Sequence, residues 1–243
     1  TAPFERQGIS EEMLIDFTPE LRAKALQIMQ DYDGGPLYSP PSERGTLVNP
    51  GWVGGGSWTG ASFDPSTQVL YVPSFTDWNL VRLSKPEAGN DQDGTPFDYV
   101  WNGDATPLVD GLPLFKPPYG RLVAIDLNAG ALLWTVANGD GPRDHPAIRH
   151  LDLPPLGQGG RVAPLVTKTF VFLGEGANVG AAFLPPGSGG KMFRAYDKAT
   201  GDVVWEMELP GGTTAAPMSY MVDGTQFVAV ASGHSLFVFA LED

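Results

Sequence analysis

One short pattern occurs twice in this chain and constrains its fold more than any other feature. Residues 124–134 and 195–205 both read A-x-D-x-x-[AT]-G-x-x-x-W, at a separation of 71 residues. The aspartate can accept hydrogen bonds from turn amides, and the glycine can adopt the positive φ of a tight turn. The strand that follows carries the tryptophan. Both segments are therefore predicted to be β-hairpins of the same kind.

Repeated hairpins predict a β-propeller. A single hairpin cannot bury both of its faces, so repeated hairpins imply sheets stacked around an axis, as in four-stranded propeller blades. A solenoid is the less favoured alternative. Blades commonly have about 40 to 50 residues, so the spacing requires a long insertion between strands, which residues 138–158 supply. Residues 61–71 keep Asp64 but replace the glycine and tryptophan, and we expect this degenerate copy to mark another blade.

Composition supports an all-β chain with one short N-terminal helix. Glycine (31) and proline (23) make up more than a fifth of the 243 residues, which favours many turns. The helix is predicted over residues 19–31, because Thr18 can cap it, Pro19 suits its first position and apolar residues follow at helical spacing. After residues 33–36 the chain continues as short β-branched and aromatic runs between turn residues.

Charge and cysteine content exclude several classes of function. The 28 acidic and 15 basic residues give a formal charge of −13, which repels nucleic acid, so we expect no nucleic-acid partner. The absence of cysteine excludes disulfides and thiolate metal sites. No run of 18 apolar residues occurs, and residues 1–7 lack a leader pattern. We expect any targeting or membrane segment to lie upstream.

The repeated hairpin resembles the tryptophan-docking motif of the quinoprotein dehydrogenases, in which the tryptophan of each blade packs on its neighbour. Three further stretches match that family in order, at residues 55–65, 160–174 and 216–234. The helix together with residues 35–42 is similar to the membrane-bound glucose, quinate and polyol branch. The chain is thus identified as resembling a pyrroloquinoline-quinone (PQQ) dependent dehydrogenase.

The resemblance implies an eight-bladed propeller, of which this chain supplies about three to four four-stranded blades plus the helix. Residues 1–243 would form the C-terminal portion of one propeller domain, with 1–45 a helix-containing insertion and 46–243 the blades. It also implies the cofactors PQQ and Ca²⁺, a sugar or polyol substrate and a quinone or cytochrome electron acceptor. The location would be periplasmic, with any membrane anchor upstream. The catalytic residues and cation ligands are expected in the remaining N-terminal half, so this chain is predicted to contain neither.

Three residues of this chain are candidates for cofactor contact. Ser57 and Trp58 occupy the place of the family signature G-G-x-N-W, so Ser57 replaces an asparagine that hydrogen-bonds the cofactor. Because a serine side chain is shorter than an asparagine side chain, we expect this contact to be lost or bridged by water. His234 ends a segment similar to the family's A-G-G-H, without the glycine-rich loop that usually follows. The structural alternatives are a core tryptophan at position 58 and a strand-end histidine at position 234.

Other motifs fail. His145 and His150 make a weak metal pair, because a proline follows the first and no helix sets their spacing, so a solvated loop is favoured. Residues 89–100 lack the ligands of a calcium loop at its first and last positions. Residues 174–180 depart from a dinucleotide fingerprint, and residues 188–191 from a phosphate loop. Trp134 and Trp205 are interpreted as packing residues.

The leading hypothesis is therefore that this chain forms part of a PQQ-dependent dehydrogenase that oxidises a hydroxyl of a sugar, polyol or cyclic polyol. The alternative is a non-catalytic propeller for binding or assembly that has lost its cofactor. Ser57 and the shortened loop after His234 favour that alternative. A third reading, based on the incomplete number of blades, is that two copies of the chain pair to close a ring.

Overall fold

The computed structural model describes residues 3–52, 54–56, 58–86, 98–176 and 189–241, and the chain divides into two compact units. Unit 1 comprises Thr1–Glu5, Gly55–Thr76 and Pro117–Asp243. Unit 2 comprises Arg6–Gly54 and Asp77–Lys116. The prediction that residues 1–243 belong to one domain, with 1–45 as an insertion, stays a prediction.

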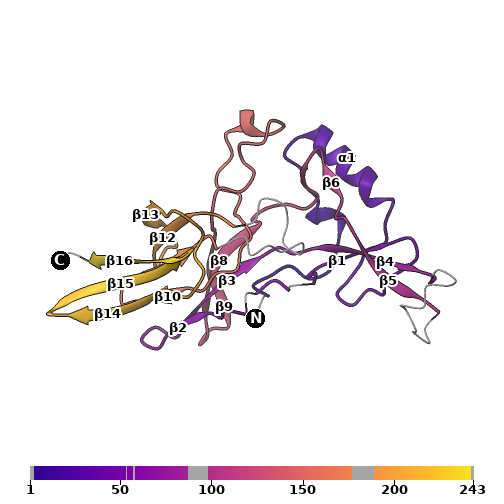
Figure 1. Cartoon of the computed structure of the whole chain (residues 1–243). Coiled ribbons are helices and arrows are strands. Elements are labelled where there is room, and N and C mark those ends of the chain that lie inside the picture. The colour runs from indigo at the N-terminus through magenta and orange to yellow at the C-terminus, as the bar shows by residue number, and fades with distance from the viewer. Residues whose placement is uncertain (1–2, 53, 57, 87–97, 177–188, 242–243) are drawn as a thin grey trace. The chain divides into compact units, whose positions relative to one another are not determined.

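Unit 1 consists of three antiparallel sheets, and each follows the order of the chain (Figure 1). The third and fourth strands of the first two sheets are the hairpins predicted from the repeat. The third sheet has three strands within the described residues. The first sheet contains β2 (Ser62–Asp64), β3 (Val69–Phe75), β8 (Gly120–Asp126) and β9 (Ala131–Ala137); the second contains β10 (Leu165–Val166), β11 (Phe170–Gly174), β12 (Met192–Asp197) and β13 (Val203–Glu208); the third contains β14 (Met218–Val222), β15 (Thr225–Ser232) and β16 (Ser235–Leu241).

The three sheets of unit 1 stack face to face. Tyr71 and Leu122 of the first sheet share a buried cluster with Leu173 of the second. Phe193 of the second sheet shares another cluster with Val228 of the third. The first strands of the first two sheets, β2 and β10, also contact each other. This stack of antiparallel meanders confirms the prediction of propeller blades.

Trp134 joins the first sheet to the second, as the repeat predicted. Its indole Nε1 donates a hydrogen bond to the carbonyl of Lys198 at 3.3 Å, and the hydroxyl of Tyr71 donates to the same oxygen at 3.1 Å. Its ring lies against Gly201, where an added Cβ would be 2.9 Å from the indole. Trp205 packs edge-on against Phe239 of the third sheet, with ring centroids 5.3 Å apart. Both tryptophans are confirmed as packing residues.

The degenerate copy at residues 61–71 does not begin a separate blade, so that prediction was wrong. It forms the β2–β3 hairpin, and β3 pairs with β8 in the same sheet. An aspartate can initiate either type of turn in a blade, and this copy lacks the tryptophan that marks the outer hairpin. The insertion predicted at residues 138–158 is confirmed between β9 and β10 and contains the 3-10 helix η3 (Arg149–Leu151). A second insertion between β3 and β8 was missed.

Unit 2 contains a helix, a three-stranded sheet and a small hairpin. Thr18 accepts a hydrogen bond from the amide of Leu21 at 3.2 Å, which confirms the predicted cap. No helix in the described part of the chain is long and apolar enough to cross a membrane. The elements are η1 (Glu11–Met13), α1 (Pro19–Met29), β1 (Thr46–Val48), β4 (Asn79–Ser84), β5 (Val100–Asp104), β6 (Leu108–Val109) and β7 (Leu112–Pro113).

Asp64 in the β2–β3 turn forms a second joint between the first two sheets. Its carboxylate accepts hydrogen bonds from Lys198 Nζ at 2.5 Å and from the hydroxyls of Ser66 and Thr67 at 2.7 and 2.8 Å. Lys198 lies on the β12–β13 turn, 134 residues away. The hydrogen bond from Lys198, supported by Ser66, holds the pKa of Asp64 well below its ordinary value of 3.8.

We expect Asp64→Asn to lower the free energy of unfolding at pH 7 by roughly 2 kcal/mol, because it removes a charge-assisted hydrogen bond between sheets. A carboxylate with a lowered pKa stabilises the fold above its unfolded value and loses that effect as the pH falls through its folded value. The difference between parent and variant should therefore be constant above about pH 4 and shrink below it. Urea unfolding from pH 7 to pH 3 measures this. A difference that does not depend on pH would contradict the assignment.

Candidate functional site

The connections between strands define two ends for the sheets of unit 1. In an antiparallel meander, alternate connections lie at the same end. The carboxyl-terminal ends of β3, β9, β11 and β15 therefore mark one end of their sheets, which we call the loop end. The side-chain amide of Asn138 donates to the carbonyl of Gly174 at 2.9 Å, so this end of the first sheet contacts that of the second.

Trp58 lies at the loop end, four residues before β2, the first strand of the first sheet. The neighbouring Thr59 donates a hydrogen bond to the carbonyl of Val162 at 2.5 Å, and Ser62 donates to Pro164 at 2.6 Å. These bonds anchor the segment where β2 meets β10. The Trp58 side chain is 81% exposed in this chain. Ser57 lies outside the described residues.

His234 also lies at the loop end, in the tight turn between β15 and β16. His234 is exposed. Because Ser232 of β15 pairs with Ser235 of β16, the turn consists of Gly233 and His234 alone, and the longer loop of the family is absent from it. The described interactions include none between His234 and Trp58. The structure thus places both predicted residues at the same end of unit 1, on different sheets.

A buried ion pair braces the loop end of the first sheet. Arg121 Nη1 donates to Glu5 Oε1 at 2.7 Å, and both side chains are 5% exposed. Arg121 also donates to the hydroxyl of Thr76 and to the carbonyl of Pro118. A Cβ at Gly55 would lie 2.3 Å from the Glu5 side chain, so only glycine permits this approach. The pair fixes the backbone two residues before Ser57.

A second buried ion pair braces the loop end of the second sheet. Arg194 donates to Glu175 Oε1 at 2.7 Å and to Glu206 at 2.9 Å. The side chains of Arg194 and Glu175 are 7% and 6% exposed. The other oxygen of Glu175 accepts from the amide of Met192 at 3.1 Å. Burial alone would lower the pKa of Arg194, but the hydrogen bond and charge of Glu175 raise it. Glu175 thereby connects the end of β11 to the start of β12.

Neither ion pair was found from the sequence. Glu5 and Arg121 lie 116 residues apart, and no short motif links them. Glu175 lies in the segment that was compared with a dinucleotide fingerprint, and that motif is defined by its glycines and not by a carboxylate. Only the spacing of Arg194 in the A-x-D hairpin, one residue before the alanine, could have marked it as inward-facing.

The weak histidine pair is not supported as a metal site. His145 Nδ1 accepts a hydrogen bond from the amide of Ala147 at 3.3 Å, which is a loop contact, and His150 is exposed. No three histidine, aspartate or glutamate side chains gather as metal ligands within the described residues. Residues 90–94 of the rejected calcium loop lie outside the described residues. The predicted solvated loop is consistent with these positions.

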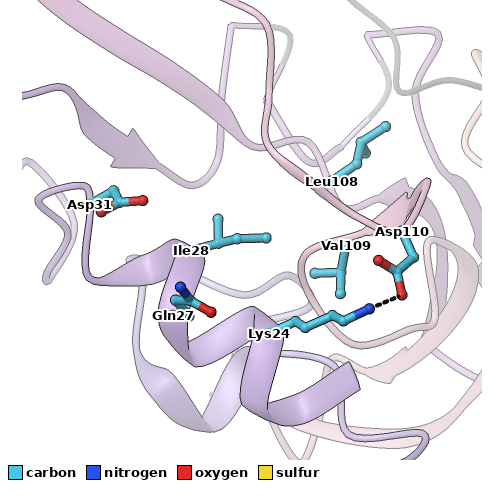
Figure 2. A pocket seen from close by; sticks show the side chains of 7 residues that line it. All are labelled: Lys24, Gln27, Ile28, Asp31, Leu108, Val109 and Asp110. Carbon is cyan, nitrogen blue, oxygen red and sulfur yellow. Dashed lines mark hydrogen bonds and ion pairs between the residues drawn. The ribbon is translucent and has the colours of Figure 1, made fainter. Parts of the chain in front are cut away.

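Unit 2 contains a shallow pocket of about 290 Å³ between α1 and β6 (Figure 2). Lys24 reaches across it to Asp110 at 2.7 Å, and both side chains are about half exposed. Ile28 and Val109 point into the space between the helix and the strand (Figure 2). Small-molecule pockets usually exceed roughly 300 Å³ and enclose most of the ligand. This open pocket contains none of the residues predicted to contact a cofactor.

Comparison with known proteins identifies what the chain resembles. Residues 1–228 match a family model described as "Glucose/ethanol/alcohol dehydrogenase, beta-propeller domain", with the short name PQQ. Quinoprotein glucose dehydrogenase A of Acinetobacter calcoaceticus is 30% identical over 223 residues, which cover 85% of this chain and 26% of that protein. The glycerol dehydrogenase large subunit of Gluconobacter thailandicus is 28% identical over 243 residues, with 85% and 30% covered.

A solved structure shows the same relationship. The quinohemoprotein alcohol dehydrogenase of Comamonas testosteroni superposes with a TM-score of 0.52 at 27% identity, covering 79% of this chain and 24% of that one. The chain therefore spans between 24% and 30% of the length of these proteins.

Proposed function

The chain belongs to the PQQ-dependent dehydrogenase β-propeller family, and we propose on that basis that it forms part of an enzyme oxidising a hydroxyl of a sugar, polyol or cyclic polyol. The observation that carries the proposal is the loop end of unit 1. An exposed indole and an exposed imidazole lie there on a braced framework of hydrogen bonds and buried ion pairs.

The residues at the loop end fit a planar, polyanionic quinone. The 81% exposed face of Trp58 offers a flat apolar surface for a fused aromatic ring, and the segment that carries it is anchored. His234 can donate a hydrogen bond to a carboxylate or quinone oxygen, and Ser57 can offer one hydroxyl. We propose these three residues as the contribution of this chain to PQQ binding.

When bound, PQQ supplies the acceptor for the two electrons and two protons released as a CH–OH group becomes a carbonyl. The contribution of this chain is to stack against that cofactor and to orient it. A base that takes the hydroxyl proton, and the ligands of Ca²⁺, are proposed to lie upstream, as the family resemblance implies. A quinone or cytochrome is the proposed electron acceptor, and the periplasm the proposed location.

The third sheet supports the proposed association with the remaining half of a propeller. Within the described residues β16 pairs with β15 alone, whereas the corresponding strands β8 and β12 each have a fourth strand beyond them. Apolar side chains of this sheet are also exposed to solvent, as an unfilled blade interface would be. They include Met218 (55%), Met221 (62%), Val222 (49%), Leu236 (67%) and Val238 (45%).

The short β15–β16 turn favours the rival function, a propeller that has lost its cofactor, because it leaves His234 without the usual glycine-rich loop. Titration of the full-length protein with PQQ and Ca²⁺ decides between the two. We expect bound-quinone absorbance and dye reduction with aldoses or polyols. Absence of binding at micromolar PQQ would exclude the dehydrogenase proposal. Pairing of two chains is tested by solution mass, and a stable monomer of 25.9 kDa would exclude it.

Trp58→Ala should weaken PQQ binding by roughly tenfold, because a stacking surface is lost. The stability of the chain should change by less than roughly 0.5 kcal/mol, because the side chain is exposed. Equilibrium dialysis against PQQ and urea unfolding measure the two effects. Tyr38→Asn is the matched control, since Tyr38 is 92% exposed and lies in unit 2. Equal PQQ affinity in parent and Trp58→Ala would remove Trp58 from the site.

A further inference from the structure

Unit 2 carries three exposed aromatic side chains beside an exposed carboxylate. Trp52, Trp101 and Tyr99 are 44%, 60% and 38% exposed. The rings of the two tryptophans have centroids 4.8 Å apart and planes inclined at 42°. Tyr99 lies two residues before Trp101, and alternate side chains of extended chain point to the same face. We call these residues, together with Glu43, the aromatic surface.

The aromatic surface is built on a fixed framework. The amide of Trp52 donates to Asn79 Oδ1 at 2.6 Å, and the preceding Gly51 amide donates to the carbonyl of Asp77 at 2.8 Å. A Cβ at Gly51 would lie 2.0 Å from Asn79 Oδ1, so the loop is seated tightly on the start of β4. Trp101 is paired in register with Leu83 across the sheet. Neither indole is therefore at the end of an unsupported loop.

Glu43 gives the aromatic surface a hydrogen-bonding group. Tyr99 donates its hydroxyl to Glu43 Oε1 at 2.8 Å. Arg82 donates to the carbonyls of Glu43 and Arg44 at 3.2 and 2.8 Å, which fixes the backbone that presents the carboxylate. A carboxylate accepts several hydrogen bonds at once, so Glu43 can accept further donors beside the rings.

We propose that the aromatic surface binds the ring of a pyranose sugar. A pyranose has an apolar face of C–H groups and a rim of hydroxyls, which match exposed indole faces beside a carboxylate. A protein partner would need roughly 800 Å² on each side, whereas three partly exposed aromatic side chains of roughly 150–250 Å² each offer less. The charge of −13 disfavours an anionic lipid surface.

The inference goes beyond the proposed function, because the aromatic surface lies in unit 2 and the proposed cofactor contacts lie in unit 1. The test is therefore made without cofactor or turnover. Methyl β-D-glucopyranoside and glycerol are titrated against the whole chain, and binding is followed by ligand-observed saturation-transfer NMR. We expect saturable binding of the glucoside and none of glycerol. Trp101→Ala should weaken glucoside binding roughly five- to tenfold, and Glu43→Gln should weaken it less.

Tyr38→Asn, which removes an exposed aromatic of unit 2 outside the aromatic surface, should bind the glucoside like the parent. Circular dichroism verifies that each variant is folded. If Trp101→Ala does not fold, Glu43→Gln still tests the surface. Absence of glucoside binding, or binding that neither variant changes, overturns the inference. Vesicle co-sedimentation and solution mass are measured on the same proteins. The inference is also overturned if Trp101→Ala loses vesicle binding or self-association while its glucoside binding is unchanged. PQQ uptake, measured separately, tests the proposed function whichever result is obtained.

Discussion

Replacing Trp134 with alanine is expected to lower the free energy of unfolding of the chain by roughly 3 kcal/mol. The indole contacts Gly201 of the neighbouring sheet and donates to the carbonyl of Lys198, so both apolar burial and a hydrogen bond between sheets are lost. Trp134→Phe keeps most of the ring but not the donor and should cost roughly 1 kcal/mol. Urea denaturation followed by circular dichroism measures both changes.

Trp58→Ala is the matched control for this prediction, because it removes the same side chain from an exposed position of the same unit. Its free energy of unfolding should remain within roughly 0.5 kcal/mol of the parent. If Trp134→Ala were as stable as Trp58→Ala, the contact between the first two sheets would not contribute to stability as described.

Arg194→Met should destabilise the chain by roughly 3–5 kcal/mol, because it leaves the carboxylate of Glu175 buried without its charged partner. The volume of the side chain is largely kept, so the loss is chiefly electrostatic. Thermal and urea unfolding at neutral pH measure it. We expect the largest effect near the ends of β11 and β12, which hydrogen exchange can localise.

The double variant Arg194→Met with Glu175→Gln should regain much of the lost stability, since an uncharged amide is cheaper to bury than an unpaired carboxylate. Lys24→Met, which breaks the half-exposed pair with Asp110, should cost no more than roughly 1 kcal/mol. A double variant less stable than Arg194→Met would show that the amide is not tolerated and that charge is not the cause.

The blades of unit 1 could be predicted because their decisive signals are local. The aspartate, glycine and tryptophan of each outer hairpin lie within one short segment, and the structure confirms both hairpins and the docking of Trp134. The N-terminal helix was predicted for the same reason, and it ends at Met29, two residues earlier than expected. The turn at Asp64 was misassigned because the inner and outer turns of a blade share their first residue.

The interactions that brace the site could not be predicted, because they join residues far apart in the chain. Lys198 meets Asp64 across 134 residues, and Arg121 meets Glu5 across 116. No periodicity or motif encodes such pairs. The exposure of Trp58 was likewise open, since a glycine-rich segment fits a buried or a solvent-facing indole equally well. Its assignment to cofactor binding, like that of His234, still depends on the family signature and stays a prediction.

The tryptophan of one sheet contacts the main chain of the next, since Trp134 donates to the carbonyl of Lys198 and its ring leaves no room for a Cβ at Gly201. Such a contact does not depend on most of the side chains of the β12–β13 turn. The side chains at positions 199 and 200 are exposed and do not enter this contact, while a side chain at position 201 would block the indole. Blades joined in this way can exchange or lengthen their loops, and so acquire new specificities, without redesign of the interface between them.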